Sequence, residues 1–346
     1  MNQDAPLGVV LLNLGGPETL DDVRPFLFRL FRDPDIIPLP KWLRWLSWPI
    51  AWLIATFRAP KSREAYASIG GGSPLRRTNE AVAHKLRARL EARGLNVRVE
   101  VAMRYWHPLT EVAVARLKEA GCERILCLPM YPQYSTTTTM SSYRAFWRAL
   151  RKARWAPEVT RVLDYHLDPR YLDCVARRIE AALVQLSEPY GDACVLFSAH
   201  SIPQDRVDQE GDPYPEHVEA MCAALAVRLP DGLKWELAYQ SRVGPVEWIG
   251  PQVPDAIERL AAEGVRRVIV VPVSFVSEHV ETLEELDQEY RHLAESLGIT
   301  QFLRVATVQD DDDFVAFLEE LTAETLLGAG DTACRRGAER CICAGG

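Results

Sequence analysis

One helix–turn–strand pattern occurs twice in the chain, and this repeat limits the possible folds more than any other feature. Residues 113–130 read AVARLKEAGCERILCLPM, and residues 256–273 read AIERLAAEGVRRVIVVPV. Each copy has a helical pattern, a glycine at the helix end, an arginine, an uncharged apolar run and a proline. An uncharged apolar run is typical of a parallel strand that is buried on both faces. The repeat therefore predicts an α/β protein with two similar halves, each a parallel sheet flanked by helices.

The repeat also predicts how the chain is divided. We place the first half at residues 1–157, the second half at 158–327 and a cysteine-containing tail at 328–346. The same correspondence pairs the first strand, LNLGGP, with LFSAHSIP in the second half. The alternative is that any two βα segments share these features. In open α/β sheets ligands bind at the carboxyl ends of the strands, so we expect a cleft between two facing sheet edges.

Charge and composition exclude some classes of protein. The net charge of −8 argues against nucleic acid as a partner, because phosphate binding needs a basic face. The N-terminal segment MNQDAPLGVVLLNLGG lacks the basic start of a secretory signal and runs straight into a strand. Eight cysteines without such a signal indicate a reducing compartment, so we expect a cytoplasmic protein. A homodimer is left open.

The longest apolar stretch, Trp42–Phe57, lies within a tryptophan-rich segment at residues 38–60, here called the lip. It is too short and too interrupted to span a bilayer, which takes about 20 apolar residues. Indole rings with basic flanks favour a lip that lies on an anionic membrane surface. The alternative is a helical hairpin packed on its own domain. The residues expected to contact the membrane are Trp42, Trp45, Trp48 and Trp52.

Two strand ends of the second half carry ionisable side chains. His200 follows one predicted strand, and Glu278, His279 and Glu281 follow the buried run Val268–Val271. Imidazole takes up protons near neutral pH, and a carboxylate binds a divalent metal or relays protons. Histidine and glutamate without cysteine suit a transient borderline metal better than a structural zinc site. These strand ends are therefore the candidate site for proton and metal chemistry.

At these residues the chain resembles the ferrochelatase family over nearly its full length. The matching segments are LLNLGGPET at 11–19, YASIGGGSP at 66–74, RYWHP at 104–108, LPMYPQYSTTTT at 128–139, FSAHSIP at 197–203, GDPYP at 211–215, YQSRVGP at 239–245 and SEHVETLEELD at 277–287. The resemblance implies two Rossmann-like halves that hold a porphyrin in a cleft between them. It also implies an enzyme, a lyase that inserts Fe²⁺ into protoporphyrin IX and releases two protons.

The resemblance assigns roles to single residues. It places the essential histidine at His200 and its carboxylate partner for the substrate Fe²⁺ at Glu281, with Glu278 and His279 along the metal pathway. It lines the porphyrin pocket with Leu14, Arg104, Tyr105, Tyr131 and Trp248, and it makes the lip a site of substrate transfer at a membrane. Two alternatives stay open, a coproporphyrin III ferrochelatase and a non-catalytic tetrapyrrole or metal carrier.

Three cysteines, Cys334, Cys341 and Cys343, lie in the last thirteen residues of the tail. Three tail thiolates and one more from the body would make a Cys₄ iron–sulfur or zinc site. Some ferrochelatases carry a [2Fe–2S] cluster at such an extension, so the cluster is preferred to a structural or redox role. The position that supplies the fourth ligand in animal relatives is Thr136 here, and we select Cys174 instead.

Overall fold

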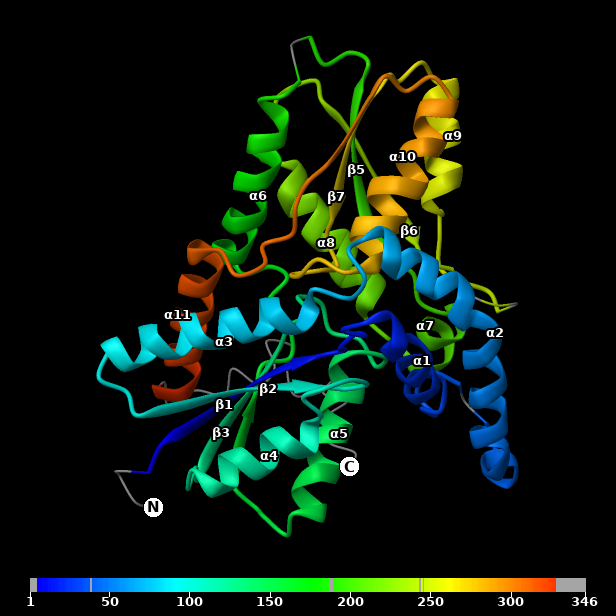
Figure 1. Ribbon diagram of the computed structural model, residues 1–346. Helices are drawn as coiled ribbons and strands as arrows, with labels where there is room; N and C mark the ends of the chain where they lie inside the picture. The colour runs from blue at the N-terminus through cyan, green and yellow to red at the C-terminus, as the bar shows by residue number, and fades with distance from the viewer. Residues whose placement is uncertain (1–4, 38, 187–188, 243, 245, 328–346) are drawn as a thin grey trace.

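Two four-stranded parallel sheets form the centre of the molecule (Figure 1). The computed structural model describes residues 5–327 apart from 38, 187–188, 243 and 245. The three tail cysteines of the predicted cluster lie outside the described residues. The strands are β1 (Leu7–Asn13), β2 (Val97–Met103), β3 (Arg124–Pro129), β4 (Glu158–Arg161), β5 (Ala193–His200), β6 (Lys234–Gln240), β7 (Arg267–Pro272) and β8 (Gln301–Arg304).

The two sheets have the same topology, which confirms the predicted fold class. Their strand orders are β2-β1-β3-β4 and β6-β5-β7-β8, so β1 and β5 hold equivalent central places. The register agrees as well, because Leu12 of β1 lies opposite Pro129 and Ser198 of β5 lies opposite Pro272. The repeated proline therefore ends the same strand in each sheet.

Helices cover both faces of each sheet. The α-helices are α1 (Val23–Phe31), α2 (Ser47–Ser68), α3 (Leu75–Ala92), α4 (Thr110–Glu119), α5 (Thr139–Lys152), α6 (Pro169–Leu183), α7 (Gln204–Glu210), α8 (Tyr214–Ala226), α9 (Val253–Ala262), α10 (Tyr290–Ser296) and α11 (Asp312–Leu327). Two short 3₁₀ turns, η1 (Leu20–Asp22) and η2 (Lys41–Leu46), precede α1 and α2. The helical segment that begins at Glu281 starts as a π-helix, η3 (Glu281–Glu289), and continues as α10.

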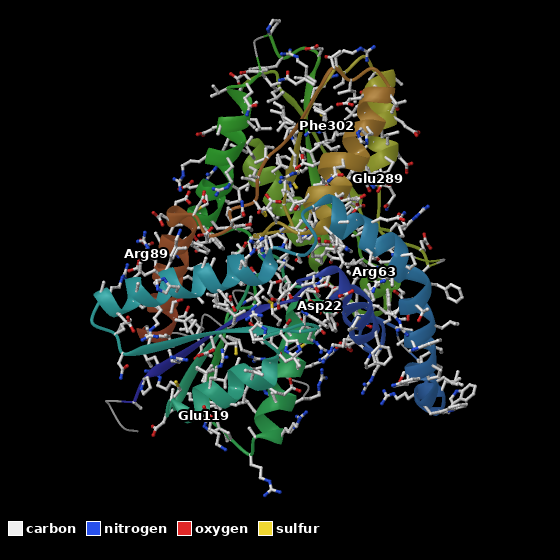
Figure 2. All side chains as sticks on the ribbon, in the orientation of Figure 1. Asp22, Arg63, Arg89, Glu119, Glu289 and Phe302 are labelled. Carbon is white, nitrogen blue, oxygen red and sulfur yellow. The ribbon has the colours of Figure 1, made fainter. Side chains whose placement is uncertain are left out.

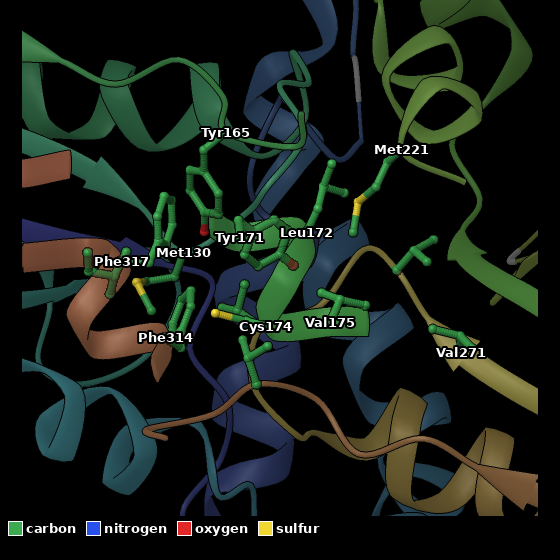
Figure 3. Close-up of a cluster of buried hydrophobic side chains, with 14 of the residues drawn as sticks. Met130, Tyr165, Tyr171, Leu172, Cys174, Val175, Met221, Val271, Phe314 and Phe317 are labelled. Carbon is green, nitrogen blue, oxygen red and sulfur yellow. The ribbon is translucent and has the colours of Figure 1, made fainter. Parts of the chain in front are cut away.

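Side chains of the central strands alternate between two cores. On β1, Val9 and Leu11 join a core that also contains residues of the second sheet, whereas Val10 and Leu12 join a core under α4 and α5. Residues of β5 divide between the shared core and a second outer core in the same way. Successive side chains of a strand point to opposite faces, which explains this division. Figure 3 shows part of the shared core, where Tyr171 and Phe317 of α6 and α11 pack together.

The last helix crosses from the second half to the first. Helix α11 lies beside α3 in Figure 1, and Glu319 of α11 forms ion pairs with Arg89 of α3 and with Arg93, the residue that follows α3. Strand β4 pairs with β3, so it belongs to the first sheet although the expected boundary after residue 157 precedes it. We therefore propose that the first half includes β4 and that α11 completes its cover.

The lip forms η2 and the first part of α2, at the outer side of the molecule (Figure 1). Its indole rings are exposed, from 75% for Trp42 and 73% for Trp45 to 44% for Trp52. The inner side of α2 packs on α1, where Trp48 contacts Phe28 edge to face at 5.7 Å. Among the described residues, no helix combines the length and the apolar character that crossing a bilayer requires.

A glycine turn between α2 and α3 packs against the loop that follows β1. The backbone N–H of Ser73 donates a hydrogen bond of 2.7 Å to the carbonyl oxygen of Pro17. A Cβ atom on Gly72 would lie 2.1 Å from the carbonyl oxygen of Glu18. This contact requires glycine for close approach of two backbone segments.

We predict that Gly72→Ala lowers the free energy of unfolding by about 1–3 kcal/mol, because the methyl group forces the two loops apart. Urea unfolding followed by circular dichroism measures this loss. Gly191→Ala is the matched control, since a Cβ atom there meets nothing within 4 Å. Equal stability of the two variants would contradict the assigned packing.

Candidate active site

His200 is the last residue of β5, and its neighbours hold it in one orientation. Its Nδ1 lies 2.5 Å from the carbonyl oxygen of Ser201. Because a carbonyl oxygen only accepts, Nδ1 donates this hydrogen bond. The hydroxyl of Tyr214 donates to the His200 carbonyl at 2.9 Å and lies 2.6 Å from Ser274 Oγ. This arrangement fixes the ring through Nδ1 and leaves Nε2 as the nitrogen that can contact another group.

Glu281 begins the π-helix η3 and pairs with a second imidazole. Its Oε2 lies 2.6 Å from Nδ1 of His279. Burial opposes ionisation of this carboxyl group, but the charges of His279 and His200 and a hydrogen bond from His279 outweigh it and lower its pKa to about 2. Glu281 is therefore a carboxylate at neutral pH.

Phe275 lies between the two imidazoles. Its ring contacts His279 edge to face at a centroid distance of 4.0 Å and His200 at 6.3 Å. His279 Nε2 is buried and has no hydrogen-bond partner among the described residues. The structure thus brings together His200, His279 and Glu281, as the sequence predicts.

Glu278, which we predict along the metal pathway, is held by an ion pair and hydrogen bonds in the structure. Both of its oxygens contact Arg304, at 2.9 and 3.1 Å, and its Oε1 also accepts the backbone N–H of Thr307 at 2.9 Å. Thr282 Oγ1 donates to Oε2 at 2.5 Å. Burial raises the pKa of this carboxyl group, but Arg304 and these donors lower it overall. With every oxygen occupied, Glu278 is a structural anchor in this conformation.

Arg304 ties this anchor to the π-helix. It leaves the end of β8, and its Nε lies 2.6 Å from Asp287 Oδ2 on η3. The side chains of Arg304 and Glu278 are 9% and 7% exposed. Gln240 of β6 holds the same segment, because its side-chain amide donates a hydrogen bond of 2.9 Å to the carbonyl oxygen of Glu281. These contacts fix the segment that carries Glu281, and π-helical turns are frequent at functional sites.

The first half brings apolar and aromatic side chains to the same place. Leu14 and Tyr105 pack in a cluster that includes Val280, the neighbour of Glu281. Tyr66 lies close enough for the charge of Glu281 to raise its pKa, although burial is the larger cause. Sequence reasoning missed Tyr66, although it begins the quoted segment YASIGGGSP.

Arg104 is held rigidly beside this cluster. Its guanidinium forms an ion pair with Asp33, and the hydroxyl of Tyr105 donates to the same carboxylate at 2.8 Å. Tyr131 begins the loop after β3, and Trp248 forms an isolated β-bridge with Pro203. None of these contacts tests whether Arg104, Tyr131 and Trp248 line a porphyrin pocket, so that role stays a prediction.

Cys174 does not fit the predicted role of a cluster ligand. It is 1% exposed, lies in the shared core of Figure 3, and its thiol is 3.2 Å from the carbonyl oxygen of Arg170. Burial raises its pKa to about 12, whereas a cluster ligand is a thiolate. We selected Cys174 because it lies near the start of a helix, at the cleft side. The amphipathic helix α6 instead turns the Cys174 side chain into the core. All the cysteines among the described residues are buried, so none offers an exposed thiol.

Three other residues escaped the sequence reasoning. Arg304, Phe275 and Tyr214 support the candidate site but touch it from different strands and helices. Tyr214 lies in the quoted GDPYP segment, and Phe275 precedes the quoted SEHVETLEELD segment. Arg304 lies in no quoted segment, so only the structure reveals it.

Comparison with known proteins gives one family. The family model described as Ferrochelatase matches residues 6–326. A protein named Ferrochelatase from Synechococcus sp. (strain RCC307) is 46% identical over 325 residues, 93% of this chain and 83% of that protein. A protein of the same name from Synechocystis sp. (strain ATCC 27184 / PCC 6803 / Kazusa) is 47% identical over 328 residues, 92% of this chain and 82% of that protein.

Two solved structures with the same fold are distant in sequence. SirB from Bacillus subtilis with Fe³⁺ has a TM-score of 0.53 and 11% identity, covering 92% of this chain and 95% of that chain. CbiX, described as the terminal enzyme for biosynthesis of siroheme in denitrifying bacteria, has a TM-score of 0.50 and 15% identity, covering 91% and 98%. At these identities the likeness concerns the two-sheet fold alone.

We predict that Arg304→Ala lowers the free energy of unfolding by about 3–5 kcal/mol, because it leaves the buried Glu278 carboxylate without its cation. Urea unfolding measures the loss. Arg259→Ala is the control, since its ion pair with Glu236 is exposed and should be worth about 1 kcal/mol or less.

The double variant Glu278→Gln/Arg304→Met removes both charges and should regain part of the stability. A loss below about 1 kcal/mol in Arg304→Ala would refute the anchoring role.

Proposed function

This chain belongs to the ferrochelatase family, and we propose that it inserts Fe²⁺ into protoporphyrin IX, giving protohaem and two protons as the last step of haem synthesis. The proposal rests on one observation, that an imidazole and a carboxylate lie together at the candidate active site. His200 is held through Nδ1 by the Ser201 carbonyl oxygen, with Nε2 as the proposed proton acceptor, and Glu281 is an ionised carboxylate paired with His279. Metallation needs both kinds of group, because protons leave the porphyrin as a cation enters.

In the proposed mechanism His200 is the catalytic base. Fe²⁺ forms bonds to four pyrrole nitrogens, and two of these nitrogens lose their N–H protons. His200 Nε2 accepts the two pyrrole protons one after the other and passes each to water, while its Nδ1–H stays bonded to the Ser201 carbonyl oxygen. Glu281 stabilises the resulting imidazolium or receives the substrate Fe²⁺, since a carboxylate oxygen suits a divalent cation.

The first half supplies the proposed porphyrin walls. Leu14 and Tyr105 already pack toward Val280, beside Glu281. We assign Tyr131 and Trp248 to the same walls, because aromatic faces pack well on a flat macrocycle. Arg104 adds a cation whose position is set by Asp33, which suits a propionate group of the porphyrin.

His200→Ala should lower kcat by about 10²–10⁴-fold, because the proton acceptor is lost. Anaerobic incubation with Fe²⁺ and protoporphyrin IX, followed by loss of free-base fluorescence, measures turnover. Porphyrin binding, measured by fluorescence titration, should persist. His84→Ala, at an exposed histidine of α3, is the control and should behave as the parent.

Activity of His200→Ala above a tenth of the parent would refute this mechanism. The same assay with coproporphyrin III tests the substrate. Faster turnover of coproporphyrin III than of protoporphyrin IX would overturn the substrate assignment, and porphyrin binding without any turnover would favour a carrier.

We further propose that the lip attaches the protein to the surface of a membrane. Trp42 and Trp45 are about three-quarters exposed, and Phe57 on the same helical arm is 77% exposed. Such rings lose unfavourable contact with water when they enter a bilayer interface. A porphyrin is poorly soluble in water, so docking at a membrane would bring substrate and lip together.

Trp45→Ala should weaken binding to phosphatidylglycerol vesicles by about tenfold or more, because removing roughly 100 Å² of inserted apolar surface costs about 2.5 kcal/mol. Vesicle co-sedimentation measures the bound fraction. Trp235→Ala is the matched control, since Trp235 is 42% exposed on β6, far along the chain from the lip. Equal loss in both variants, or no vesicle binding by the parent, would contradict the proposal.

The [2Fe–2S] cluster stays a proposal that rests on the spacing of Cys334, Cys341 and Cys343. The described part of the chain supplies no exposed cysteine as a fourth ligand. A fourth ligand would therefore come from a residue other than cysteine or from a rearrangement around a buried thiol. A cluster, when bound, would supply one-electron redox chemistry, and no step of the proposed metal insertion uses it.

Purified protein should show visible absorption bands that dithionite bleaches, together with two iron and two sulfide per chain, if the cluster forms. Cys341→Ser should abolish the bands, whereas Cys174→Ser should leave them unchanged. A colourless protein that holds zinc on the tail would refute the cluster, and loss of the bands in Cys174→Ser would restore Cys174 as a ligand.

A further inference from the structure

A cluster outside the candidate active site joins one carboxylate and two imidazoles. Asp164 and His166 follow β4 at the end of the first sheet, and His217 lies on α8 beside the second sheet. One potential ligand atom from each of the three lies within 4.8 Å of the others. The two imidazole rings are nearly parallel, with centroids 4.0 Å apart and planes inclined by 13°.

Hydrogen bonds orient both rings. Asp164 Oδ1 lies 3.0 Å from Nδ1 of His166 and accepts a hydrogen bond from it, which leaves Nε2 of His166 for a metal ion. The backbone N–H of Tyr134 donates to Nδ1 of His217 at 3.3 Å, so Nε2 is the nitrogen of this ring that is left for a metal ion. A metal ion binds neutral imidazole, so its binding displaces any proton on the ligand nitrogen.

The three side chains differ in how deeply they are buried. His166 and His217 are each 6% exposed, whereas the side chain of Asp164 is 35% exposed. Two stacked imidazoles inside the protein cannot both become charged without strong repulsion. A carboxylate at their solvent side provides negative charge and a route by which a cation arrives.

We propose that Asp164, His166 and His217 bind a divalent cation of the Zn²⁺ class, at a site distinct from His200 and Glu281. Two imidazoles and one carboxylate are the donors of borderline metals, with water in the fourth position. Zinc bonds of about 2.0–2.1 Å place tetrahedral ligand atoms about 3.4 Å apart, so the two imidazoles have to turn out of their stacked arrangement to point at one ion. Zn²⁺ binds such donors more tightly than Fe²⁺ does.

Such an ion would connect the two halves of the protein. Two ligands come from the segment after β4 of the first sheet, and the third comes from α8. Tyr134, whose N–H contacts His217, belongs to the loop after β3 that also carries Tyr131. A cation there would tie this loop, the end of the first sheet and α8 to one point, and a ligand that binds only the native state raises its stability.

The test uses the full chain with His200 and the three tail cysteines replaced, as the variant His200→Ala/Cys334→Ser/Cys341→Ser/Cys343→Ser. Competition with a chromophoric chelator measures the binding of Zn²⁺ to this parent variant. One equivalent should bind, and it should raise Tm by a few degrees when Zn²⁺ is in hundredfold excess over Kd. Co²⁺ in place of Zn²⁺ should give visible d–d bands without thiolate charge-transfer absorption.

Adding His217→Ala or the nearly isosteric Asp164→Asn should weaken binding at least tenfold and remove the rise in Tm. Adding His292→Ala, at an exposed histidine of α10, should leave both unchanged. Circular dichroism without metal checks that each variant folds, and Asp164→Asn decides the question if His217→Ala does not. Absence of Zn²⁺ binding in the parent variant, or an unchanged Kd in Asp164→Asn, would overturn the proposal.

Discussion

Burial of both faces of the central strands governs where chemistry is possible in this protein. Each strand at the centre of a sheet, β1 or β5, lies between two parallel neighbours and under two layers of side chains. Such strands have no room for charged groups along their length, because an unpaired buried charge is costly. Ionisable residues therefore gather where strands end. His200 ends β5, and Glu278, His279 and Glu281 follow β7.

This constraint explains why much of the fold and part of the site could be predicted. The uncharged run Val268–Val271 indicates a doubly buried strand, and the repeated proline marks the same strand end in both halves. A histidine and a carboxylate placed after neighbouring strands of one sheet must meet. The cluster of indoles with basic flanks also indicated the exposed tryptophans of the lip.

The remainder depended on contacts between distant segments. Arg304 comes from β8 and forms an ion pair with Glu278 at the sheet edge. No pattern in the sequence predicts that pairing. For the same reason Glu278 was expected on a metal pathway, although its carboxylate is fully engaged. The π-helical turn at Glu281 was also beyond prediction, because its side-chain pattern suits an α-helix. Cys174 shows a different limit, since position in a helix does not tell which face packs inward.

The packing of α11 against α3 affects how the chain folds while it is being synthesised. A ribosome releases the first sheet long before α11, yet Phe314 and Phe317 of α11 belong to the core that the two sheets share. The N-terminal half therefore emerges with part of its apolar surface uncovered, and it stays so until the last described helix has been synthesised. Neither half alone therefore buries all of its apolar surface, and this burial is complete only in the whole molecule.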